Sequence, residues 1–187
     1  MYLIIIIFFI FVSSFFGQNL KNEQTDSIIT WDKNRNLNWG DFKGTVGWDD
    51  PLGNAMTSYK IEVIPENVLV DENDQILNYE DLSVVANFYC YHSWVNKSTY
   101  NLLKHEQTHF NIAELFARKL RKRFWELKNE EEKRFSIYYS EHMKFFKMCR
   151  NMQEKYDQET QHGNDFEGND TWDMLIQREL NSLKEFE

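Results

Sequence analysis

The sequence predicts an α+β fold in one domain, with a small antiparallel sheet first and a helical half after it. Alternating apolar and polar residues indicate short strands before about residue 96. From there almost to the C-terminus, apolar residues recur at helical spacing. A run of strands followed by a run of helices is typical of an α+β domain rather than of alternating βα units.

The chain opens with a segment that we expect to direct export. Residues 3–12 form an unbroken apolar run, and Ser13, Ser14 and the small residue Gly17 follow it. The run is too short to span a bilayer comfortably, so residues 1–17 are predicted to be a secretory signal peptide. No Lys or Arg precedes the run, which leaves an uncleaved anchor as the alternative. We expect a periplasmic or extracellular protein with no stable membrane span after processing.

The folded domain is expected over residues 37–187, because residues 18–36 are polar and predict a loose leader. Its first segment, 37–55, is dense in Trp, Gly and Asp and predicts loops and turns. Residues 56–66 then alternate from Tyr59 onward and predict a strand.

A hairpin and a second strand are expected next. Apolar residues 68–70 and 76–77 flank a turn-rich pentapeptide, DENDQ. Residues 82–96 carry the strongest strand pattern of the chain. The alternating positions of that pattern are Ala86, Phe88, Cys90, His92 and Trp94.

Three helices are predicted in the second half. The first spans about 99–127, with Thr99 as a candidate N-cap. The second spans about 131–153. Glycine and asparagine in 156–170 predict a break, and a short helix over about 171–184 follows.

Residues 105–109 of the first predicted helix read HEQTH, the most informative feature of the chain. At 100° per residue, His109 lies about 40° from His105, so one metal ion can bind both imidazoles. Glu106 stands beside that position, where it can activate a metal-bound water. The other interpretation is two core histidines and a solvated glutamate on an ordinary amphipathic helix, with Glu114 and Arg118 on its polar face.

A catalytic zinc site needs a third protein ligand. Glu114 lies about 180° from His105 on a continuous helix, which suits an ion pair with Arg118 better than metal binding. We favour His162, because a histidine beside Gly163 in a predicted loop can reach the metal from outside the helix. Position alone leaves three rivals open, namely Glu141, His142 and His92.

The string KHEQTHFNIAELFARKL, with YDQETQHG some fifty residues later and NWGDFKG and FYCYHSWV upstream, resembles a bacterial family of secreted, predicted zinc-dependent proteases. That family carries a domain-of-unknown-function name, and the resemblance covers most of residues 37–180. It implies zinc ligation by His105 and His109 and catalysis by Glu106, and the YD-T-HG string supports His162. Thr108 and Asn111 depart from the residues common in the family.

Charge and cysteine content narrow the class of protein. The formal net charge of -9 makes nucleic acid a poor partner. Neither cysteine has the spacing of a zinc motif. An exported chain permits a Cys90–Cys149 bridge, but a domain of this size does not need one.

These observations predict a zinc metallohydrolase that acts on a peptide or protein. Zn²⁺ is expected on His105, His109 and His162, with Glu106 as general base. Tyr156 is a candidate donor to the oxyanion. The alternatives are a non-catalytic envelope protein with a structural zinc or partner-binding role, and a hydrolase of a non-peptide cell-wall amide.

Overall fold

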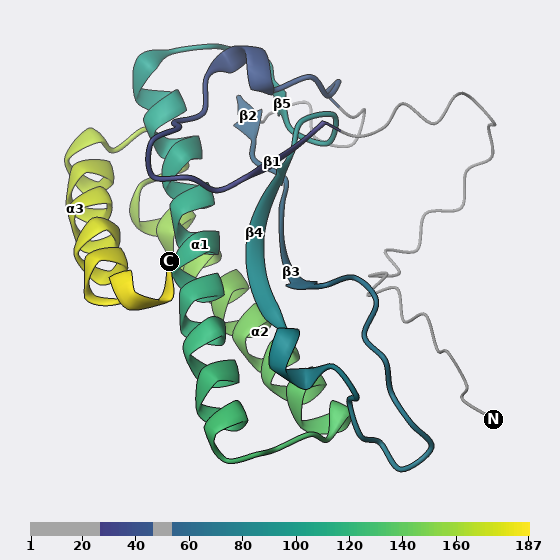
Figure 1. The fold of residues 1–187 in the computed structure, drawn as a ribbon. Coiled ribbons are helices and arrows are strands. Elements are labelled where there is room, and N and C mark those ends of the chain that lie inside the picture. The colour runs from purple at the N-terminus through teal and green to yellow at the C-terminus, as the bar shows by residue number, and fades with distance from the viewer. Residues whose placement is uncertain (1–26, 47–53) are drawn as a thin grey trace, which may run out of the picture.

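The computed structural model describes residues 27–46 and 54–187, and its strands precede three helices (Figure 1). The predicted α+β class is therefore confirmed. The expected signal peptide, residues 1–17, lies outside the described residues. Within the described ranges, no helix is long and apolar enough to cross a membrane.

The sheet half consists of two small antiparallel sheets. The larger one has the strand order β1-β4-β3, formed by β1 (Ile28–Thr30), β4 (Ser83–Tyr89) and β3 (Tyr59–Ile64). The smaller one pairs β2 (Ala55–Met56) with β5 (Trp94–Val95). Alternate β4 residues are apolar and face the core, as the sequence pattern predicted. These inward residues are Val84, Ala86 and Phe88, with Ile61 of β3 opposite Ala86.

The prediction of a loose leader over residues 18–36 is wrong for residues 27–36, the part of this range that the structure describes. Ile28–Thr30 pairs with the end of β4, and Ile29 faces Phe88. Trp31 then donates from Nε1 to the side-chain oxygen of Asn111, 2.9 Å away on the central helix. Residues 27–36 therefore belong to the fold, because a strand as short as three residues still completes a sheet edge.

The predicted hairpin over residues 68–77 is present in outline. Val70 and Ile76 form an isolated bridge, and Leu77 donates from its main chain to Leu69.

Short 3-10 turns complete the connections. They are η1 (Trp39–Asp41), η2 (Tyr79–Asp81) and η3 (Lys184–Phe186).

Three helices build the second half. The first, α1 (Tyr100–Asn129), begins at the predicted cap, where Thr99 Oγ1 accepts from the Leu102 main chain. Helix α2 (Phe135–Glu159) and helix α3 (Phe166–Ser182) follow. Figure 1 shows α1 at the centre, between the sheet on one side and α3 on the other, with α2 behind it.

The break between the second and third helices is shorter than the predicted range, residues 156–170. Helix α2 continues six residues beyond the predicted end, to Glu159, and α3 begins at Phe166. Asp165 caps α3 by accepting from the Gly168 main chain at 3.0 Å, and a Cβ at position 168 would lie 2.8 Å from the same carboxylate. As a result, two residues expected in a loop lie on helices and face the centre of the molecule. They are Asp157 and Asn169.

Helix α1 is buried on nearly all sides, which corrects the predicted solvated face. Glu114 and Arg118 form the expected i,i+4 ion pair at 2.9 Å, but each side chain is only 3% exposed. Arg121 also binds the Glu114 carboxylate and donates to the Val84 carbonyl in β4. The polar face of α1 therefore packs against Trp31, β4 and the C-terminal segment rather than water.

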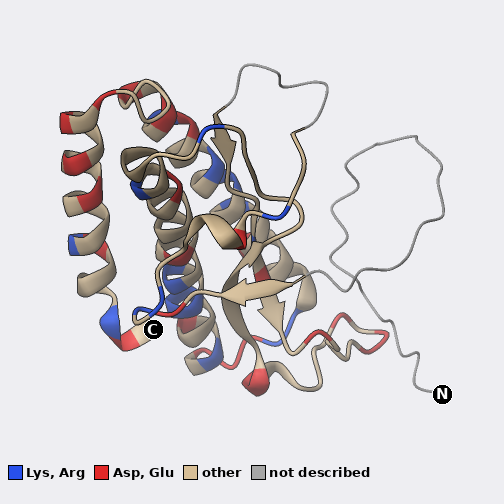
Figure 2. Ribbon diagram, turned by 90° about the horizontal axis from the view of Figure 1, so that it is seen from above, with Lys and Arg blue, Asp and Glu red and all other residues tan. Residues whose placement is uncertain are grey.

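Both cysteines are buried as free thiols. The permitted Cys90–Cys149 bridge is therefore not formed. Cys149 lies on α2, with Sγ 3.7 Å from the hydroxyl of Tyr59. Figure 2 shows acidic and basic residues interspersed over the described helices, with acidic positions frequent on α3.

Candidate metal centre

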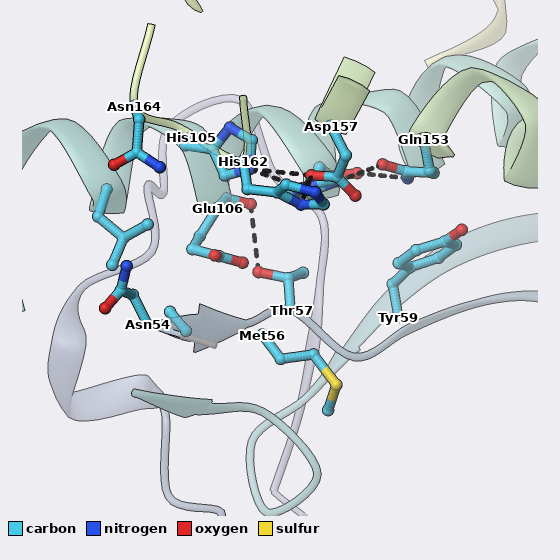
Figure 3. A pocket seen from close by; sticks show the side chains of 13 residues that line it. Asn54, Met56, Thr57, Tyr59, His105, Glu106, Gln153, Asp157, His162 and Asn164 are labelled. Atoms are coloured by element: carbon cyan, nitrogen blue, oxygen red, sulfur yellow. Dashed lines mark hydrogen bonds and ion pairs between the residues drawn. The ribbon is translucent and has the colours of Figure 1, made fainter. Parts of the chain in front are cut away.

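A cavity of about 570 Å³ opens where α1, the end of α2 and strand β2 meet. Figure 3 shows the side chains that line it, with β2 across the cavity from α1. One wall carries the motif residues His105, Glu106 and His109. The remaining lining residues are Asn54, Ala55, Met56, Thr57, Tyr59, Leu102, Gln153, Asp157, His162 and Asn164.

Three side chains converge on one point at this cavity. Nε2 of His105 and Nε2 of His109 lie 3.1 Å apart. Oδ1 of Asp157 lies 3.2 Å from the first and 3.0 Å from the second. Among the described residues, these three form the one group of His, Cys, Asp and Glu atoms close enough together to hold a metal ion.

The orientation of His109 is fixed by Gln153, which lies one helical turn before Asp157 on α2. Gln153 donates from Nε2 to the His109 carbonyl at 2.9 Å. Its Oε1 must therefore face His109 Nδ1 and accept a hydrogen bond from it. With the proton on Nδ1, His109 Nε2 carries a lone pair toward Asp157.

His105 is held in the same way from α3. Its Nδ1 donates to Oδ1 of Asn169 at 3.0 Å, and that oxygen also accepts from the Tyr156 hydroxyl at 2.8 Å. The Tyr156 ring stacks on the imidazole with ring centroids 4.6 Å apart. Gly163 closes the other side, since a Cβ there would lie 3.0 Å from His105 Cγ. His105 Nε2 is thus also left as an acceptor.

Two imidazole lone pairs and a carboxylate oxygen therefore face one another at hydrogen-bond distance. Such a group of acceptors needs a cation or a shared proton between its members. The donors suit zinc, because ligands about 2.0–2.1 Å from one ion lie no more than about 4 Å apart. All three measured separations meet this limit.

Opposite charges within the group shift the pKa values of Asp157 and His109. Partial burial alone would raise the pKa of Asp157, but the hydrogen bonds and charges of His105 and His109 outweigh it and hold that pKa well below its usual range. Burial alone would lower the pKa of His109, yet Asp157 and Glu106 raise it. Asp157 is therefore a carboxylate at neutral pH, the form in which aspartate side chains bind metal ions.

Glu106 lies on α1 one residue after the first histidine, and its side chain reaches into the cavity (Figure 3). It is 3% exposed, and its Oε2 has no hydrogen-bond partner among the described residues. A buried carboxylate oxygen without a partner is costly, and it indicates a place for a water or a ligand. Its own main-chain carbonyl accepts from Thr57 Oγ1 at 3.3 Å, which ties this turn of α1 to the strand opposite.

His162 lies at the rim of the same cavity but outside the tight group. Its side chain is 78% exposed, and its Nδ1 is 3.6 Å from Asp157 Oδ1. Gln161, His162 and Gly163 all have positive φ, so the chain turns sharply here and carries His162 over Asp157. The structure thus brings His162 beside the centre without placing it among the converging atoms, and its role as a ligand stays a prediction.

The remaining candidates lie away from the converging atoms. Tyr156 is fully buried behind His105 and is not part of the cavity lining, so the expected oxyanion donor instead supports a histidine. Glu141 binds Arg123 at 3.1 Å. His142 bonds from Nε2 to the Ile61 carbonyl at 2.9 Å. His92 lies in the turn between β4 and β5, and its ring stacks on Tyr89.

Asp157 is the residue that sequence reasoning missed, because it was assigned to a loop. A signal was present: Gln153 and Asp157 are four residues apart, and so are Cys149 and Gln153. Extended by one turn, the predicted second helix places these three on one face. That face is the one that α2 turns to His109.

Residues 91–163 match the sequence profile of a family described as "Bacterial protein of unknown function (DUF922)". The matched segment contains the three converging residues, Glu106 and His162, and it ends before Asn169. This supports the resemblance to a bacterial family of unknown function and carries no activity with it. No curated protein and no solved structure shows a significant match to the chain.

Proposed function

We propose that this protein is a zinc-dependent metallohydrolase, and specifically a peptidase. In this proposal His105, His109 and Asp157 hold the metal and Glu106 is the general base. The observation that carries it is the convergence of two imidazole lone pairs and a carboxylate on one point of an open cavity. Histidines at i and i+4 with a glutamate between them are typical of zinc peptidases in which the glutamate activates a metal-bound water.

Zinc bound at this centre would supply Lewis-acid chemistry and make water more acidic. The chain supplies the rest. Glu106 is within the cavity, buried, and has a carboxylate oxygen free of hydrogen bonds within the described structure, so it can take a proton from water. Gln153 and Asn169 hold the two imidazoles so that Nε2, rather than Nδ1, faces the metal position.

A purely structural zinc site is the main rival. Structural sites are closed by four protein ligands, whereas catalytic sites keep one position open. Three residues that could hold a metal ion converge among the described residues, and they line a cavity rather than a packed interior. This arrangement favours catalysis. His162 is the residue that distinguishes a structural from a catalytic zinc site, since its rotation into the group would give a fourth ligand.

The proposal is tested by purifying residues 18–187, measuring bound metal and profiling the cleavage of a peptide library against Glu106→Gln. We expect one zinc per chain and cleavage that the variant lacks. Zinc without any cleavage would favour the structural rival, and cleavage of cell-wall amides alone would change the substrate class. Export is part of the proposal, and N-terminal mass analysis of the native protein should show loss of residues 1–17.

A further inference from the structure

Strand β2 forms the wall of the cavity opposite the metal centre, and one of its edges has no strand partner in the described structure. The smaller sheet contains β2 and β5 alone. Four consecutive residues of this segment, 54–57, line the cavity, so the main chain itself borders it. β3 continues the same path after Thr57, and it too is the edge strand of its sheet.

The register of β2 shows which main-chain groups face outward. Ala55 lies opposite Val95 and Met56 lies opposite Trp94. Asn54 accepts from the Asn96 main chain at 2.7 Å, so this pair is a hydrogen-bonded one. Hydrogen-bonded and non-bonded pairs alternate along an antiparallel ladder. The N–H and C=O of Ala55 therefore point away from β5, toward the free edge.

The free edge runs past the reacting groups. Thr57 is held to the Glu106 carbonyl, which fixes β2 across from the turn of α1 that carries the motif (Figure 3). Asn54 and Asn164 lie at one end of the cavity and Tyr59 lies at the other. A chain that followed the edge of β2 would pass between it and the converging atoms of His105, His109 and Asp157.

We infer that the substrate is an extended polypeptide segment that adds to β2 as a strand and exchanges hydrogen bonds with the N–H and C=O of Ala55. The inference rests on the proposed function and names its substrate class. An extended main chain presents a donor and an acceptor at every second residue, the spacing that a sheet edge requires. A substrate with a single amide would use this edge at one point alone.

Hydroxamates test the inference without any need for turnover, because they bind zinc directly. The probes are acetohydroxamate and a trialanine peptide that ends in a hydroxamate, each titrated calorimetrically into the zinc-loaded protein. Strand pairing should make the peptide probe bind at least about ten-fold more tightly. In the peptide probe, replacing the main-chain amide that faces Ala55 by an ester should weaken binding about 3- to 10-fold, since it deletes one hydrogen-bond donor.

The matched protein variants are Ala55→Pro and Val95→Pro. Each removes one N–H that points out of the β2–β5 ladder, but only Ala55 borders the cavity. We expect Ala55→Pro to weaken the peptide probe about 3- to 10-fold and to leave acetohydroxamate unchanged. Val95→Pro should alter neither.

Two results would overturn strand pairing while leaving the metal centre intact. One is a peptide probe that binds no more tightly than acetohydroxamate. The other is a peptide advantage that survives the ester replacement, which needs no change to the protein and so stands even where Ala55→Pro fails to fold. Binding of neither hydroxamate would overturn the metal centre and the inference together.

Discussion

His105 and His109 meet edge to face, with their Nε2 atoms 3.1 Å apart and their ring centroids 4.6 Å apart. Each ring turns its other nitrogen to an amide oxygen from a different helix, Gln153 of α2 or Asn169 of α3. Helices α2 and α3 thus determine which nitrogen of each histidine is free. The group of side chains that could hold a metal ion is assembled by tertiary contacts around a motif that lies on one helical turn.

The third ligand can be identified by comparing Asp157→Ala with His162→Ala. Asp157 Oδ1 lies among the converging atoms, so its loss should lower zinc affinity by more than about 100-fold. His162 is mostly exposed and lies outside that group, so its loss should cost about ten-fold or less. Competition with a chromogenic chelator measures both affinities. The reverse order would return the role to His162.

Glu106→Gln should bind zinc and unfold like the wild-type protein while losing turnover by about 10²- to 10⁴-fold. The amide has nearly the same shape but cannot accept the proton from water. Metal analysis, thermal unfolding and the rate of peptide cleavage check the three parts. Near-normal turnover in this variant would show that Glu106 is not the base.

Gln153→Leu should lower zinc affinity by about 10- to 100-fold, because His109 loses the acceptor that fixes its Nδ1 proton. Gln158→Leu is the matched control, since Gln158 is exposed on the same helix. It should leave the affinity unchanged. Equal losses in both variants would indicate a general effect on α2 instead of an effect on His109.

Glu114→Gln should lower the free energy of unfolding by about 3 kcal/mol, because Arg118 and Arg121 lose the buried carboxylate that they share. The control is Glu154→Gln, which breaks an i,i+4 pair with Arg150 whose side chains are 62% and 60% exposed. That change should cost less than about 0.5 kcal/mol. Urea unfolding of the zinc-loaded proteins measures the difference. Similar costs would mean that the Glu114 pair is effectively solvated.

The stability of the protein should fall in mild acid through His142. Burial lowers the pKa of His142, and the hydrogen bond with the Ile61 carbonyl offsets this only in part. The folded state therefore favours the neutral ring. The stability that the neutral His142 ring contributes is present above the pKa of histidine in the unfolded state, about 6.5. It is lost as the pH falls below that value.

His142→Gln isolates this effect, since glutamine can donate to Ile61 but does not titrate. Unfolding free energies of both proteins should be measured in urea from pH 7.5 to pH 5, with a chelator present so that zinc release does not contribute. The wild-type protein should lose more stability over this range than the variant. Parallel curves would assign the acid sensitivity to other groups.

Local patterns in the sequence were enough for the fold class and for half of the site. Alternation placed β3 and β4, and helical spacing with Thr99 placed the start of α1. Because i and i+4 residues share a helix face, the approach of His105 to His109 also follows from sequence alone. These features depend on residues within a few positions of one another.

Features that depend on packing were not accessible in the same way. Helix α2 extends through Glu159 because its last turn packs against α1, where Gln153, Tyr156 and Asp157 find partners that local propensity does not reveal. The burial of Glu114 and Arg118 follows from Trp31 and the C-terminal segment, which cover a face with a polar sequence. The sequence determined which residues can bind a metal; the arrangement of three helices decided that Asp157 joins them, because its partners lie about fifty residues away along the chain.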